Sequence, residues 1–331
     1  MESTIKRGAA RARSLLQERG IPYSDEVPLR SSGKQFPGGG QYGIEIPVVT
    51  SLKILETIVP LLQNAGIMRA RFGETVGELV LSESEKMEML ACCNETGYGM
   101  LFSTGPRPEY DRKATFARSE FGIEQGRVLN NHEAFAHAID GALRVIDAGC
   151  KGIITYDLGV LRTLSRLRHD GVIPKDTTFA TSTHSMVANA MIAEVYVENG
   201  ANNLVVLHDI SLQVVQEIRA HVPDSVSISL PIDVYKAKGG FIRFGEIPEI
   251  IQVGAPIFLK MGASAQGHPY DAVTKDGIAR RVERVKIGLD HLARSGLDAA
   301  CLPDDSPYWL IPRRTWAQAS PASPRLEPAE A

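Results

Sequence analysis

The chain has 331 residues, of which 44% are hydrophobic and 23% charged, and its formal net charge is −3. This composition is ordinary for a globular protein, and the charge lacks the basic excess typical of nucleic-acid binding, so we expect no nucleic-acid partner. The basic stretch MESTIKRGAARARSLLQERG has no apolar core like that of a secretory signal or a membrane span, so we expect a cytoplasmic protein with no membrane partner.

The predicted elements begin with an N-terminal arm. A helical pattern is followed by IPYSDEVPLRSSGKQFPGGGQ, whose Pro, Gly and Ser content predicts a loop. From Tyr42 onward, short apolar runs bounded by turns alternate with segments whose apolar residues recur at helical spacing. The predicted strands are 42–49, 67–72, 99–104, 152–157, 177–182, 203–209, 226–234 and 255–262. The helical patterns that follow them are 51–66, 84–97, 132–149, 158–171, 186–200, 210–222, 246–254 and 277–296.

Eight strand–helix units in series favour an α/β fold of the (β/α)8 TIM-barrel type over an open sheet. No G-x-G-x-x-G follows the first strand, so we expect neither a nucleotide nor a flavin cofactor. We predict an arm over 1–41, a single-domain barrel over 42–297 and a C-terminal extension over 298–331. The Pro- and Ala-rich end of that extension, SPASPRLEPAEA, is predicted to be disordered.

The active face of such a barrel lies at the carboxyl ends of its strands. Titratable residues near these ends are candidates for general acid/base catalysis, namely Glu45, Asp157, His184, His208 and Lys260. The candidates for substrate binding are Arg69, Arg71, Arg107, Ser182, Asp233 and Tyr235. The arginines are suited to hold a carboxylate or phosphate group of the substrate.

Several of these residues have a structural alternative. Glu45 alternates with two isoleucines and so faces the barrel interior, where a buried carboxylate needs a partner. Arg69 or Lys260 could be that partner. Lys260, on an apolar strand, suits either general-base or Schiff-base use, or an ion pair with Glu45 or Asp157. Asp157 could instead cap the helix that starts at Leu158.

The segment TSTHSMVANA places His184 between two serines, Ser182 and Ser185. No G-x-S-x-G pattern occurs in the chain, so we do not expect a serine nucleophile. We expect Thr183 or Ser185 to cap the next helix. His184 would then lie at the rim and contact the substrate or transfer a proton.

The cysteines and the side chains at the strand ends are the possible metal ligands. The four cysteines form no CxxC pattern and no Cys/His cluster in the sequence, so we expect no structural zinc or iron–sulfur cluster. A divalent metal stays an open alternative, because several strand-end side chains could supply mixed nitrogen and oxygen ligands. These side chains are Glu45, Asp157, His184, His208 and Asp233.

Three stretches together resemble the peptidase U32 family, also called collagenase-like proteases. They are GCKGIITYDLGVLRTLSRL, TFATSTHSMVANAMIAEVYVENGANNLVVLHDISLQVVQEIRA and SISLPIDVYKAKGGFIR. The three sequence motifs typical of the family fall on residues 157–159, 182–189 and 207–212, and the resemblance extends over 42–262. It implies a TIM-like barrel and a peptidase or hydrolase activity. Relatives hold an iron–sulfur cluster on four cysteines after the seventh strand, whereas VYKAKGGFIRFGEIPEI has none, as in a short, cluster-free branch.

We therefore expect an enzyme, a hydrolase or lyase, that acts on a small polar substrate such as an amide, an amino acid derivative or a carboxylate. Its mechanism would be general acid/base hydrolysis or elimination, with or without a metal. The alternatives are a true peptidase and a non-catalytic partner in a modification complex. A homo-oligomer is compatible with the sequence, which does not locate the contact surface.

Overall fold

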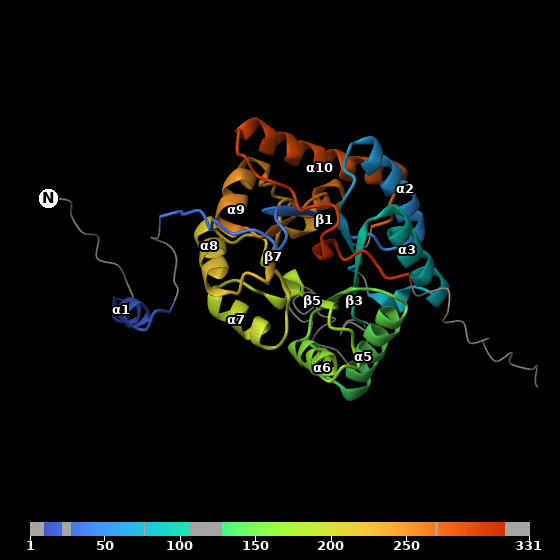
Figure 1. The fold of residues 1–331 in the computed structure, drawn as a ribbon, viewed down its shortest axis with the longest axis horizontal. Helices are drawn as coiled ribbons and strands as arrows, with labels where there is room; N and C mark the ends of the chain where they lie inside the picture. Colours follow the sequence, from blue (N-terminus) through green and yellow to red (C-terminus); the bar gives the residue numbers. More distant parts are fainter. Residues whose placement is uncertain (1–9, 22–27, 76, 106–127, 269–270, 315–331) are drawn as a thin grey trace, which may run out of the picture.

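The eight predicted strands form one closed barrel in which every neighbouring pair is parallel, in the order β1 to β8 (Figure 1). The computed structural model describes residues 10–21, 28–75, 77–105, 128–268 and 271–314. The prediction of a (β/α)8 barrel is confirmed. The strands are β1 (Tyr42–Pro47), β2 (Arg71–Gly73), β3 (Gly99–Ser103), β4 (Gly152–Thr155), β5 (Thr178–Thr181), β6 (Asn203–Val205), β7 (Ser227–Pro231) and β8 (Ile257–Lys260).

Helices surround the barrel, and the last of them packs against the first helix of the ring, α2, to close it (Figure 1). Their apolar faces and the outer faces of the strands form one large core. The described helices are α1 (Ala10–Glu18), α2 (Leu52–Asn64), α3 (Glu83–Thr96), α5 (His132–Asp147), α6 (Leu158–His169), α7 (Ala190–Glu198), α8 (Leu212–His221), α9 (Ile247–Gly254) and α10 (Lys275–Ser295).

Most of these helices begin at a polar side chain that accepts a hydrogen bond from a free backbone N–H of the first turn. The capping residues are Ser51, Ser82, Asn131, Asp157, Asn189, Ser211 and Thr274. One expectation is wrong here, because Asn189 caps α7 in place of Thr183 or Ser185. The helix begins later than the sequence pattern indicates, since a short 3-10 helix, Thr183–Ser185, precedes it.

The second strand also begins later than expected. Residues 67–70 form a connection, and β2 starts at Arg71, which pairs with Glu45 of β1 and Gly99 of β3. Arg69 therefore lies before the strand, at the amino-terminal end of the barrel. Its guanidinium donates to the carbonyl of Asp304, and it lies away from the carboxyl ends of the strands.

The amino-terminal end of the barrel is closed by residues 298–314, with help from Phe36 of the arm. Trp309 is fully buried and its ring lies 6.0 Å from that of Phe258, which also contacts Phe36. Leu310 packs inside the barrel with Leu101 and two further apolar side chains. Figure 1 shows this C-terminal segment crossing the barrel end. We name it the floor of the barrel; the extension's predicted disordered end lies outside the described residues.

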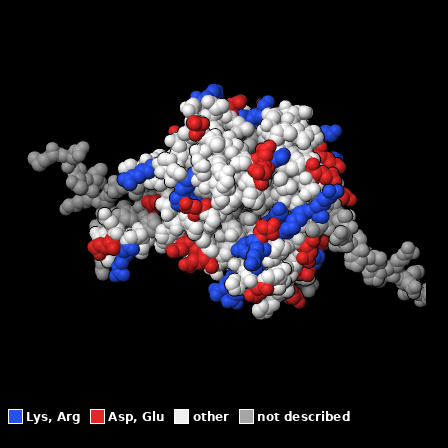
Figure 2. Space-filling model, in the orientation of Figure 1, with Lys and Arg blue, Asp and Glu red and all other residues white. Residues whose placement is uncertain are grey.

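Charged side chains of both signs are interspersed over the face seen in Figure 2, with uncharged surface between them. Within the described ranges, no helix combines the length and the apolar character that crossing a bilayer requires. The interspersed charges agree with the small net charge of −3.

The floor generates a stability prediction. Trp309→Ala should lower the free energy of unfolding by about 4 kcal/mol, because it leaves a cavity beside Phe258 and Phe36. Tyr308→Ala, at a neighbouring ring that is only partly buried, should cost clearly less. Urea unfolding of both variants measures the difference. Equal losses would show that the buried indole does not support the barrel.

Candidate active site

A buried ion cluster fills the middle of the barrel. Glu45 points inward because its two neighbours, both isoleucines, point to the helices. Residues paired across parallel strands face the same side, and Glu45 pairs with Arg71 on β2 and with Lys260 on β8. The carboxylate accepts from Arg71 Nε at 2.9 Å and Nη2 at 2.7 Å, and Lys260 Nζ lies 2.8 Å from its other oxygen.

Neutral polar groups complete the cluster. Arg71 Nη2 also donates to Asn203 Oδ1 at 3.0 Å and to the Ser229 hydroxyl at 2.8 Å. The Ser229 hydroxyl also lies 3.0 Å from Glu45 Oε2 and 3.2 Å from Asn203 Oδ1. The orientation of its O–H bond decides to which of these two oxygens it donates. The guanidinium of Arg71 lies over the ring of Phe258, 3.3 Å from its centroid. The cluster therefore stands on Phe258 of β8, whose ring contacts Trp309 of the floor.

The electrostatics of the cluster are decided by its ion pairs. Burial favours the neutral form of Glu45, but Lys260 and Arg71 outweigh it and lower the pKa of this carboxyl to about 2. Among the residues that the structure describes, neither cation has a second carboxylate partner. Two cations thus face one anion, so these three side chains together carry one positive charge more than they need for neutrality.

Lys260 differs from the rest of the cluster in its exposure. Its side chain is 12% exposed, whereas those of Glu45 and Arg71 are 1% exposed. Lys260 is the last residue of β8, so it stands at the carboxyl end of the barrel. The alternative that it forms an ion pair with Glu45 is confirmed. Lys260 is therefore the cation of the cluster that a ligand at the barrel mouth can reach.

Asp233 and Tyr235, which follow β7, have structural contacts at the same end. The carboxylate of Asp233 accepts from the backbone N–H groups of Gly262 and Ser264, both at 2.7 Å, and so holds the loop after β8. The Tyr235 hydroxyl has no hydrogen-bond partner within the described part of the chain. Burial raises the pKa of this phenol, although Arg281 opposes the shift.

Asp157 is a helix cap. One of its oxygens accepts from Val160 N–H at 2.9 Å, in the first turn of α6, and the other accepts from Leu129 N–H at 3.0 Å. The alternative that Asp157 caps the helix is confirmed. Because both oxygens are used by backbone groups, we assign it no part in the chemistry below.

The serine and histidine of the TSTH segment do not form a catalytic pair through their side chains. The Ser182 hydroxyl accepts from the backbone N–H of His184 at 3.3 Å, and the Ser185 hydroxyl accepts from Ser182 N–H at 3.1 Å. This capping box belongs to the short helix Thr183–Ser185. The ring of His184 is half-buried and its centroid lies 6.2 Å from that of Tyr156.

His208 is also half-buried, and its ring stacks on Phe241 with centroids 5.5 Å apart. Arg71 is enclosed by its partners and 1% exposed, so the structure does not support direct binding of a substrate anion by it. Arg69 lies at the opposite end of the barrel from the other candidates, so its substrate-binding role has no support either. Arg107, with the rest of its arginine-containing segment, lies outside the described residues.

Sequence reasoning missed several residues of this region. Asn203 and Ser229 lie at inward positions of apolar strands, and the alternation that identified Glu45 could have found them. Arg281 could not have been found, because it reaches the barrel from α10 and donates to the carbonyl of Val48. Val48 has φ 60°, a strained value for a β-branched residue, at the end of β1.

The strand-end side chains that could supply metal ligands do not come together as a metal centre in the described part of the chain. Over the described ranges, no group of three or more His, Cys, Asp or Glu is arranged to hold a metal ion. Asp157 and Asp233 already bind backbone N–H groups with both oxygens, and Glu45 is paired with two cations.

No protein-family model matches the chain, and no curated protein matches its sequence. Among solved structures the chain is similar to a U32 peptidase, with 16% identity and a TM-score of 0.39 over 61% of this chain and 73% of that one. It is also similar to thiamine phosphate pyrophosphorylase from Pyrococcus furiosus, with 12% identity, a TM-score of 0.43 and coverages of 76% and 96%. It is similar as well to a truncated 3-deoxy-D-arabino-heptulosonate 7-phosphate synthase from Thermotoga maritima, with 10% identity and a TM-score of 0.42. That match covers 84% of this chain and 93% of the other. Membership of the U32 family stays a prediction, and the barrel assignment rests on the strand pairing itself.

The ion cluster predicts how stability depends on pH. The folded pKa of Glu45 is about 2, below the ordinary 4.5, so its ionisation stabilises the fold above pH 4.5 and this contribution is lost as the pH falls toward 2. Glu45→Gln should lower the free energy of unfolding at neutral pH by about 3 kcal/mol and flatten its pH dependence in that window. Denaturant unfolding at several pH values measures both effects. The exposed Glu88→Gln is the control, and parallel curves for wild type and Glu45→Gln would contradict the prediction.

Proposed function

We propose that the chain is a TIM-barrel enzyme whose small substrate carries, or develops during the reaction, a negative charge that Lys260 binds at the barrel mouth. The observation that supports this proposal is the excess positive charge of the buried cluster, with Lys260 as its exposed end. Of the substrate classes compatible with the sequence, carboxylates, including amino acid derivatives, fit this charge best.

The role proposed for Lys260 is that of a fixed ammonium group. The low pKa of Glu45 keeps this carboxylate ionised at neutral pH, and Lys260 Nζ lies 2.8 Å from it. This ion pair favours a charge-binding role for Lys260 over Schiff-base formation. An ammonium held in place before the reaction can stabilise an oxyanion without the cost of reorienting solvent.

Glu45 and Arg71 act through Lys260 in this proposal. Glu45 positions the ammonium at 2.8 Å, and Arg71 fixes the other oxygen of the same carboxylate. Proton transfer is assigned to a histidine at the rim, either His184 after β5 or His208 after β6. The proposed reaction is hydrolysis or elimination by general acid/base chemistry, in which the histidine moves the proton and Lys260 holds the charge.

Removal of the ammonium tests the proposal. Small carboxylates such as succinate and malonate should raise the melting temperature of the wild-type protein and of the exposed control variant Lys275→Met, but not that of Lys260→Met. With a substrate found by mass spectrometry of retained ligands, Lys260→Met should lower kcat/KM by about 100-fold or more. Carboxylate binding that is equal in Lys260→Met and wild type would refute the anion-binding role.

A second variant pair separates proton transfer from nucleophilic catalysis. Ser182→Ala removes the hydroxyl that accepts from His184 N–H, so it should cost about 1 kcal/mol of stability yet leave kcat within about threefold of wild type. His184→Asn should lower kcat by about 100-fold and remove a step from the pH–rate profile if His184 moves the proton. A loss of about 10⁴-fold in Ser182→Ala would instead identify a nucleophilic serine.

A further inference from the structure

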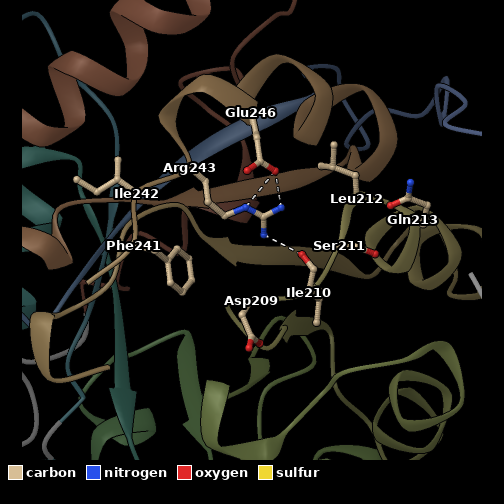
Figure 3. A pocket seen from close by; sticks show the side chains of 9 residues that line it. All are labelled: Asp209, Ile210, Ser211, Leu212, Gln213, Phe241, Ile242, Arg243 and Glu246. Atoms are coloured by element: carbon tan, nitrogen blue, oxygen red, sulfur yellow. Dashed lines mark hydrogen bonds and ion pairs between the residues drawn. The ribbon is translucent and has the colours of Figure 1, made fainter. Parts of the chain in front are cut away.

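A groove lies beside the barrel mouth, between the loop that leads from β6 into α8 and the segment that leads from β7 into α9 (Figure 3). Its volume is about 540 Å³, within the range of pockets that hold small organic molecules. Its lining residues are Asp209, Ile210, Ser211, Leu212, Gln213, Phe241, Ile242, Arg243 and Glu246.

Arg243 joins the two sides of the groove. Its side chain is 9% exposed, and it donates to the carbonyl of Ile210 at 2.9 Å and to Glu246 Oε2 at 2.8 Å. Figure 3 shows the guanidinium between Glu246 and Ile210. A weaker bond at 3.4 Å reaches the carbonyl of His208. The groove is therefore built in advance by a buried side chain that ties both loops together.

The charges that remain accessible in the groove are negative. Arg243 is neutralised by Glu246, with which it forms an ion pair. Asp209 is exposed and forms no hydrogen bond or ion pair with any residue in the described ranges. The groove thus presents one uncompensated carboxylate. Ser211 caps α8 beside the groove through Val214 N–H, so one N–H group of this helix end is already bonded.

The lining also has an apolar part, made by Ile210, Leu212, Phe241 and Ile242. Ile242 is 48% exposed, so its side chain offers apolar surface to an occupant of the groove. In the view of Figure 3, the ring of Phe241 and the carboxylate of Asp209 lie on the side of Arg243 away from Glu246. A face of Phe241 stacks on His208, so an occupant of the groove lies one ring away from a candidate proton-transfer residue.

We propose that this groove binds an organic cation, in which a primary ammonium group is joined to an aromatic or aliphatic body. The ammonium pairs with Asp209, and the body packs on Phe241 and Ile242, where an aromatic face also attracts a cation. The inference is independent of the role of Lys260, because the carboxylate and the apolar surface of the groove carry it alone.

Titration calorimetry of the full chain with phenethylammonium tests the inference, with 2-phenylethanol as the neutral probe and phenylacetate as the anionic probe. Phenethylammonium should bind more tightly than either, and Asp209→Asn should weaken its binding about fivefold or more. Glu249→Gln removes an exposed carboxylate of α9 outside the groove and should change binding less than twofold. Circular dichroism confirms that both variants are folded.

Three outcomes would overturn the inference. The first is equal binding of phenethylammonium and 2-phenylethanol, which would mean that charge plays no part. The second is tighter binding of phenylacetate, and the third is an equal effect of Asp209→Asn and Glu249→Gln. In addition, the imidazole resonances of His208 should shift on titration with phenethylammonium, and unchanged resonances would place the probe elsewhere.

Discussion

The ion cluster of Glu45, Arg71 and Lys260 is the constraint on which the rest of the barrel depends. A carboxylate and a guanidinium that are both 1% exposed would be very costly without each other, because the interior has a low dielectric constant. Barrels of this type are usually filled by branched aliphatic side chains, which pack without any such demand. Here the partners come from β1, β2 and β8, with Asn203 and Ser229 adding hydrogen bonds from β6 and β7. The cluster therefore fixes the relative register of most of the barrel as well as its charge.

The chain uses charged side chains at its strand ends for two different purposes. Asp157 and Asp233 bind backbone N–H groups in the loops around the mouth, and so they stabilise the loops that surround the site. Asp209 and Lys260 keep accessible charge, and they are the residues that a ligand can meet. Sequence position cannot separate these purposes, because both kinds of residue lie at or shortly after the end of a strand.

The architecture was predictable because eight apolar runs alternated with helical patterns, and the alternation within β1 was enough to turn Glu45 inward. The ion pair with Lys260 was one of two alternatives for that lysine. Arg69 was misplaced because β2 begins at Arg71, four residues later than its apolar pattern. Arg281 and the groove arise from contacts between elements far apart in the chain, for which a single sequence carries no signal. Strand existence was thus accessible to local reasoning, whereas strand boundaries and side-chain partners depended on tertiary packing.

The floor gives the barrel a particular order of completion during synthesis. Phe258 lies between Arg71 above and Trp309 below, so the aromatic base of the ion cluster is covered by a segment that follows all eight strands. Ribosomes deliver the chain from its N-terminus, and residues 298–314 emerge after α10. Without this segment, Phe258 would lack the cover that Trp309 provides below the ion cluster. Burial of the charged side chains thus depends on a part of the chain that is synthesised after every strand that contributes to the cluster.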